Sequence, residues 1–114
     1  MQFHSVLNLS IPAAAAIPAE TFVTATGALP TAGGNAFGVA RAPSTAAGQL
    51  LPVDVLGTAI VLSGGAFAVG AALSSDINGN AIAQPGAAPN TVVARALQAA
   101  TAAGQRIEVA LIPN

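Results

Sequence analysis

The sequence predicts a mainly β domain with at most one short helix. Runs of β-branched and other apolar residues alternate with clusters of Gly, Pro, Asn and Ser, which is the pattern of short strands joined by turns. The run with the strongest strand preference is Ile107–Ile112, near the C-terminal end. The 114 residues suffice for one domain. We expect an N-terminal arm over residues 1–18 and a single β domain over residues 19–114.

The composition is that of a protein that depends on neighbours. Only 6% of the residues are charged, against about 25% in an ordinary soluble domain, and lysine is absent. The 29 alanines bury little area each, so the core of one chain is thin. Much of the surface is therefore expected to meet other protein or lipid. The formal net charge of -1 offers no electrostatic footprint for nucleic acid, and the lack of cysteine excludes disulfides and thiol chemistry.

The N-terminal segment, residues 1–18, is extended and apolar. Phe3, Leu7 and Leu9 share one side of a strand with two-residue alternation, and Val6 lies on the other side. The alanine run that follows is bracketed by prolines and is too short for a stable helix. The segment is either the first strand and linker of the domain or an arm laid on a partner.

Three strands are expected after this segment. Glu20–Thr26 is rich in β-branched and aromatic residues, and Ala36–Ala40 follows a stretch of turn residues. Pro43 then stops any helix, and the chain returns as the strand Leu50–Leu56.

The uncharged stretch from Val55 to Ser75 has two interpretations. Its length matches a membrane span. However, it contains four glycines, acidic residues bound it, and it lacks basic flanks and an aromatic belt. We therefore expect two buried strands, Thr58–Leu62 and Ala66–Val69, joined by a hairpin turn at Ser63-Gly64-Gly65.

Asp76–Asn80 carries the clearest local signal in the chain. Asn78 and Gly79 supply the positive φ values of a type I′ turn, so residues 73–77 and 80–83 should pair as a hairpin. The same residues resemble the start of a calcium loop, but the bidentate Glu that such a loop requires does not follow them. The turn is the favoured interpretation.

An internal repeat frames the domain. Residues 38–57 read GVARAPSTAAGQLLPVDVLG, and residues 92–111 read VVARALQAATAAGQRIEVAL. The flanks align at an offset of 54, whereas the Ala-Ala-Gly-Gln words between them are offset by 56. This alignment indicates that the loop is shifted by two residues between the two copies, while its flanks keep the same register. We expect two similar strand-return units, side by side in one domain.

The alignment at 54 places charged residues at matching positions. Arg41 precedes Asp54 by the same distance along the chain as Arg95 precedes Glu108. Across a hairpin-like return each Arg reaches its acid, which predicts two ion pairs that fix structure or orientation. A catalytic dyad of Asp54 and Glu108 is the alternative, and only the assumed symmetry favours it.

Local propensity and the repeat disagree in the second copy. Residues 91–104 show a capping residue, helix formers and a final Gly, as in a helix, whereas Pro43 forbids a helix in the first copy. We expect a strand at 92–97, a helical turn within 98–103 and a strand at 106–112.

Residues suited to catalysis are scarce. His4 is the only histidine and lies in the N-terminal segment, where nothing positions it as a base. The glycine pairs lack the Lys-Ser/Thr ending of a phosphate-binding loop. We expect no catalytic residue, no cofactor and no metal.

From about Ala19 to Pro113 the chain shows a characteristic succession of motifs. A Gly-Val-Ala-x-Ala strand, an Ala-Ala-Gly-Gln turn and a Val-x-Val strand precede an uncharged hairpin and an Asp-x-Asn-Gly-Asn turn. A C-terminal Val-x-Arg-Ala-Leu and Ile-x-Val-x-Leu complete it. This succession resembles the capsid cement, or head-decoration, proteins of tailed bacteriophages. The matching positions are Gly38, Arg41, Gly48, Asp54, Gly57, Gly79, Arg95, Ala96, Leu97, Gly104, Val109 and Leu111.

The resemblance implies a β-clip or β-tulip barrel or sandwich that sits on the outer capsid surface, commonly as a trimer. Its implied work is to clamp neighbouring major-capsid subunits, so the partners would be the major capsid protein and further copies of the chain, with no nucleic acid and no membrane. The residues expected at the capsid or subunit interface are Phe3, Val6, Leu7, Leu9, Ile11 and Ile17. Two other functions stay open: a membrane protein that spans with residues 55–75, and a β-clip module that binds a surface carbohydrate.

Overall fold

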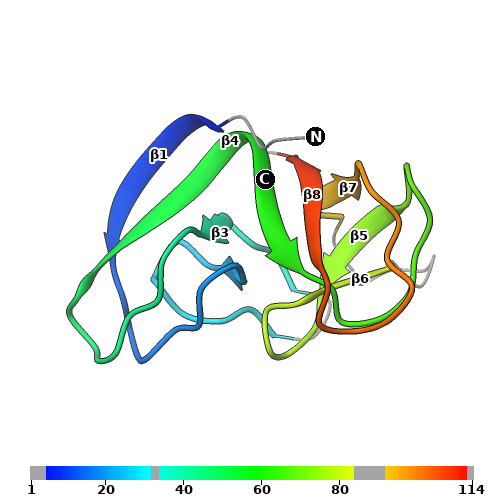
Figure 1. The fold of residues 1–114 in the computed structure, drawn as a ribbon. Coiled ribbons are helices and arrows are strands. Elements are labelled where there is room, and N and C mark those ends of the chain that lie inside the picture. The colour runs from blue at the N-terminus through cyan, green and yellow to red at the C-terminus, as the bar shows by residue number, and fades with distance from the viewer. Residues whose placement is uncertain (1–4, 32–33, 84–91, 113–114) are drawn as a thin grey trace.

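The computed structural model describes residues 5–31, 34–83 and 92–112, and these residues form strands and turns without a helix (Figure 1). The prediction of a mainly β fold is confirmed. The helical turn expected within 98–103 is not formed. Those residues form turns around an isolated bridge between Ala100 and Phe67, because the backbone of Ala100 exchanges both of its hydrogen bonds with that of Phe67.

The strands form one strongly curved, nearly closed antiparallel sheet. Their order in it is β2-β3-β4-β8-β7-β5-β6, and β1 pairs with β4 beside this path. A bridge between Ser63 and Ala81 links the end of β4 to β6. The strands are β1 (Ser5–Pro12), β2 (Phe22–Val23), β3 (Gly38–Ala40), β4 (Leu50–Leu62), β5 (Ala72–Ser75), β6 (Ala81–Ala83), β7 (Ala94–Ala96) and β8 (Arg106–Leu111).

Strand β4 is longer than the sequence predicts. It runs through 13 residues without a break, so the two strands expected at 50–56 and 58–62 are one. Gly57 has a φ of 90°, a conformation that glycine adopts at little cost, and it lies where β4 passes from pairing with β1 to pairing with β8. Figure 1 shows that β4 is bent along its length. The first half of β4 pairs with β1 and β3, and the second half pairs with β8. The hairpin expected between Thr58–Leu62 and Ala66–Val69 is therefore wrong, and Ala66–Val69 is not a strand.

Strands β5 and β6 pair as a hairpin across the turn that holds Asn78 and Gly79. The turn is not type I′, because among its residues only Gly79 has a positive φ, of 80°. Gly79 N donates to Asp76 O at 3.1 Å, which makes a three-residue loop with glycine in the left-handed position. The Asp76 carboxylate accepts hydrogen bonds from the backbone N–H groups of Asn78 and Asn80, both at 2.9 Å. Its Oδ1 thus serves the turn itself.

The chain folds as two units of the same topology, which lie side by side in Figure 1. The first unit, residues 5–56, holds β1, β2, β3 and the first half of β4. The second unit, residues 57–111, holds the second half of β4, then β5, β7 and β8 in the equivalent places, with β6 in addition. The two ladders superpose pair by pair. Equivalent pairs are Leu9–Val53 and Ala59–Val109, Ile11–Leu51 and Val61–Ile107, and Phe22–Val39 and Ala72–Arg95.

The strand register corrects the alignment of the internal repeat. Arg41 N donates to Pro52 O at 2.9 Å. The same bond in the second unit runs from Leu97 N to Glu108 O, at 3.0 Å. Arg41 therefore corresponds to Leu97 and not to Arg95, which is an offset of 56 (97 − 41). The sequence alignment at 54 was off by two positions, a shift that preserves strand alternation and so leaves the same side chains on each face.

The Ala-Ala-Gly-Gln turns have the same offset of 56 as the strands on either side of them. In Thr45–Gln49 and Thr101–Gln105 the backbone N–H of the Thr donates to the side-chain oxygen of the Gln, at 2.7 and 2.9 Å. The glycines of the two turns have φ values of 89° and 87°. The loop was expected to be shifted relative to its flanks, whereas in the structure the turn and the flanking strands share the offset of 56.

Each unit has its own core, on equivalent faces of its strands. Three side chains of the first unit, Phe22, Ala36 and Val39, also join the core of the second unit. The first unit thus covers part of the second. The buried core of the first unit consists of Ala13, Ile17, Val23, Ala40, Leu51, Val53 and Val55. That of the second consists of Ala59, Val61, Phe67, Leu73, Ala81, Val93, Ala94, Ala96, Ala100, Ile107 and Val109.

Candidate functional site

The segment expected as an arm lies along β4. β1 pairs with it from Ser5, opposite Gly57, to Pro12, opposite Leu50. Ile17 was expected at an interface, but it is 2% exposed and belongs to the core of the first unit. The described part of residues 1–18 is thus built into the first unit.

Two leucines of β1 remain at the surface. Leu7 and Leu9 are 40% and 38% exposed, and Leu56, the partner of Leu7 in β4, is also exposed. These three residues are called the leucine surface below. Of the other expected interface residues, Ile11 is half-buried, Val6 belongs to β1, and Phe3 lies outside the described residues.

The leucine surface adjoins an open strand edge. Among the strands that the structure describes, β1 pairs with β4 alone. Its sequence, SVLNLSIP, contains no charged residue. Soluble proteins usually protect such an edge with charges, bulges or a covering segment, because its free backbone groups accept another strand. β1 has register shifts between Ser5 and Asn8, and it pairs with β4 in regular register from Asn8 to Pro12. The edge of β1 is suited to contact with another protein.

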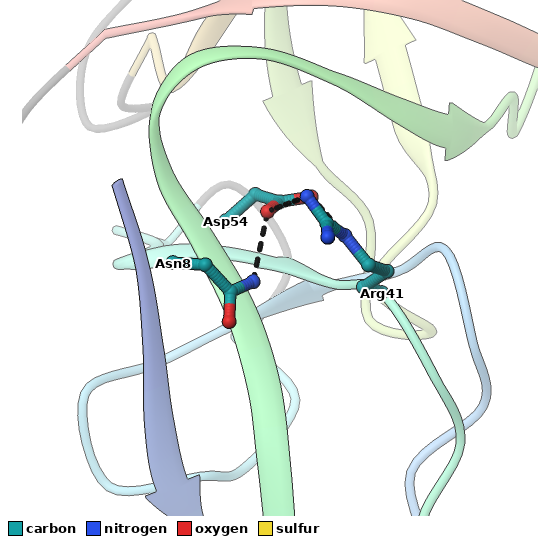
Figure 2. Close-up of polar contacts among 3 residues, drawn as sticks. All are labelled: Asn8, Arg41 and Asp54. Carbon is teal, nitrogen blue, oxygen red and sulfur yellow. Dashed lines mark hydrogen bonds and ion pairs between the residues drawn. The ribbon is translucent and has the colours of Figure 1, made fainter. Parts of the chain in front are cut away.

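A second group of residues surrounds the buried carboxylate of Asp54 (Figure 2). Asp54 is 2% exposed and lies in β4 between β1 and β3. Arg41, which directly follows β3, donates to it from Nη2 at 2.7 Å and from Nε at 3.3 Å. Asn8, opposite Asp54 in β1, donates from Nδ2 at 2.9 Å. The structure thus brings Arg41 and Asp54 together, and the buried charge is neutralised.

The structure does not bring Arg95 and Glu108 together. Arg95 lies opposite Ala110 and donates from Nη1 to Gly70 O at 3.4 Å. Glu108 is 1% exposed, and its Oε1 has no hydrogen-bond partner among the described residues. The expected pair depended on the offset of 54, and the true offset places Leu97, not an Arg, at the position that Arg41 occupies.

Sequence reasoning missed a second ion pair. Arg106 Nη2 lies 2.6 Å from Glu20 Oε2, although the two residues are far apart in the sequence. Glu20 has a φ of 61°, the only positive φ among the described residues other than glycine. Because Glu20 belongs to the first unit and Arg106 to β8, the pair joins the two units. No local sequence pattern predicts a contact between residues so far apart in the sequence.

The two ion pairs border a cavity of about 100 Å³ between the units, lined by Glu20, Arg41, Asp54, Ile60 and Arg106. None of the described residues that line it carries an imidazole, a hydroxyl or a thiol, and their charged groups pair with one another. In the described ranges, no three His, Cys, Asp or Glu side chains lie close enough to hold a metal ion. Of the two ion pairs, Glu20–Arg106 joins the units, and Arg41–Asp54 lies within the first unit.

Residues 55–75, which one hypothesis treated as a membrane span, form β4 from Val55 to its end, a loop and all of β5. Within the described part of the chain, no helix is long and apolar enough to cross a bilayer.

Comparison with known proteins identifies the family. The model of the phage cement protein family matches residues 1–111. No curated protein matches the chain. Among solved structures, the head fiber gp8.5 N base of bacteriophage phi29 is similar, with a TM-score of 0.68, 19% identity and 93% of each chain covered; at this identity the likeness shows the fold. The family match spans nearly the whole sequence, and the chain belongs to the phage cement protein family.

Proposed function

We propose that this protein decorates the outer surface of a phage head and stabilises the shell by bridging neighbouring major-capsid subunits, as a homotrimer. It acts by binding alone, without catalysis or a cofactor. Membership of the phage cement protein family supports this function. The similar fold of a head fiber base supports a place on the head of the virion.

The observation that carries the proposal is the leucine surface beside the open edge of β1. Its three leucines are exposed in a chain with few charged residues, and the edge next to them is uncharged. Covering this surface removes apolar area from water, which contributes roughly 25 cal/mol per Å². A neighbouring protein, either a capsid subunit or another copy of the chain, would therefore stabilise the fold by binding it.

The proposal is tested by cosedimentation of the purified protein with expanded capsids that lack decoration. Leu9→Asp places a charge in the leucine surface and should weaken capsid binding by about tenfold or more. Ile77→Asp is the matched control, because Ile77 is exposed at the tip of the β5–β6 turn, and it should bind like the wild type. A folded wild-type protein that does not bind expanded capsids, or that binds glycans in their place, would contradict the proposal.

A further inference from the structure

Within the chain, the second unit is covered by the first. Glu20 O accepts a hydrogen bond at 2.9 Å from Leu62 N, at the end of β4, and the Glu20 carboxylate holds Arg106. Phe22 N donates to Gly79 O at 2.7 Å, and the Phe22 side chain joins the core of the second unit. The segment Glu20–Phe22 therefore seals the second unit along the edge of β4.

Among the residues that the structure describes, none covers the equivalent edge of the first unit in this way. In the two ladders, β1 corresponds to the second half of β4, and Leu9 corresponds to Ala59. Ala59 is fully buried, whereas Leu9 is 38% exposed. Arg106, which the Glu20 carboxylate holds, corresponds to Leu50, and Leu50 is 70% exposed. The first unit presents an apolar edge where the second unit is sealed.

The second unit carries a counterpart of the covering segment, in which Val69 and Gly70 are exposed. Glu20 N donates to Ala40 O, and Gly70 N donates to Ala96 O, both at 2.7 Å. Gly70 is therefore the equivalent of Glu20, and both residues have a positive φ. Val69, beside Gly70, is 63% exposed. This segment precedes β5, at the opposite end of the molecule from β1 (Figure 1).

We propose that a second copy of the chain supplies the missing cover, with Val69–Ala72 of one copy lying against β1 and Leu50 of the next. The contact repeats, between copies, the arrangement that the two units have within one chain. It joins two different surfaces of the molecule, so it is head-to-tail, and such contacts close into a ring when the rotation allows. The inference deepens the self-association in the proposed function and rests on it.

The chemistry of the matched positions favours an apolar contact between copies. Within one chain, Glu20 forms an ion pair with Arg106. At the equivalent positions between copies, Gly70 and its neighbour Val69 would contact Leu50. Leu62, whose N–H binds Glu20 O, corresponds to Pro12, which has no N–H to donate. The interface between copies thus lacks both the ion pair and this hydrogen bond. Association driven by apolar burial should persist at high salt, where an exposed ion pair is screened.

The test uses the absence of cysteine from the chain. Leu50→Cys and Val69→Cys proteins are each treated with a short bis-maleimide, first alone and then mixed. In a head-to-tail contact the two thiols come from different surfaces, so only the mixture should give covalent dimers. The double variant Leu50→Cys/Val69→Cys should give a ladder of products that ends at the size of the ring.

Each outcome decides the proposal. A mixture of Leu50→Cys with Ile77→Cys serves as the control and should not cross-link. Dimers from Leu50→Cys alone would show a symmetric contact and overturn the inference, as would no dimers from the Leu50→Cys and Val69→Cys mixture or equal cross-linking with the control.

A second pair of substitutions tests the same contact without thiols. Leu50→Arg and Val69→Glu each introduce a charge and should each lower self-association about tenfold in sedimentation. Combining them between copies restores a matched pair, and a mixture of the two single variants should regain part of the loss. The inference would be overturned if neither single variant lowered self-association and the mixture changed nothing. Capsid binding is a separate measurement: if the mixture of Leu50→Cys and Val69→Cys proteins binds expanded capsids but gives no cross-linked dimers, the ring fails while decoration stands.

Discussion

The first and second units share their ladders and differ in what covers them. The Phe22 side chain of the first unit packs into the core of the second unit. Its equivalent in the second unit is Ala72, whose side chain is too small to fill another core. Leu50 is exposed where its equivalent, Arg106, is held in an ion pair. The comparison teaches that a duplicated fold can keep its registers and change mainly the residues where one unit meets the next.

The largest expected effect comes from removing the cover of the second unit. Phe22→Ala leaves a cavity at a side chain that is 1% exposed, so the free energy of unfolding should fall by about 3–5 kcal/mol. Phe37→Ala, at a partly exposed aromatic, is the control and should cost much less. Urea denaturation measures both. Equal losses would show that Phe22 does not join the units.

A smaller effect distinguishes the two buried carboxylates. Asp54→Asn removes the charge that Arg41 neutralises and to which Asn8 donates a hydrogen bond, and should lower the free energy of unfolding by about 1–3 kcal/mol. Glu108→Gln removes a buried charge whose Oε1 has no partner among the described residues, and should leave stability unchanged or raise it by about 1 kcal/mol. Thermal and urea unfolding compare these isosteric changes. Equal destabilisation by both would contradict the contrast.

The smallest effect is expected at Glu20. Glu20→Gly gives the first unit the residue that the second unit has at the equivalent position, Gly70. The relief of a positive φ, about 1 kcal/mol, offsets the loss of an ion pair to Arg106, whose side chain is 69% exposed. Stability should therefore stay within about 1 kcal/mol of the wild type. Glu20→Ala loses the ion pair and keeps the strain, so it should unfold at lower urea than Glu20→Gly, and the reverse order would be inconsistent with strain at this position.

Several elements could be predicted because their signals are local. The strand at 106–112 follows from its residue types, and the turn at Asp76–Asn80 follows from Asn78-Gly79. Arg41 and Asp54 could be brought together because a hairpin-like return joins them. Ile17 could not be assigned to the core or to an interface. Its apolar side chain indicates that something covers it, but not whether this is the core of its own chain or a partner.

The sequence by itself determined the β class of the fold, the turn residues, the shortage of charge and the family resemblance, because composition and turn chemistry act over a few residues. Only the tertiary structure decided that Arg41 corresponds to Leu97, because strand alternation is unchanged by a shift of two positions. It also decided that β4 is one strand that continues through Gly57 and that Glu20 reaches Arg106. These depend on how the two units pack, and packing joins residues that no local pattern connects.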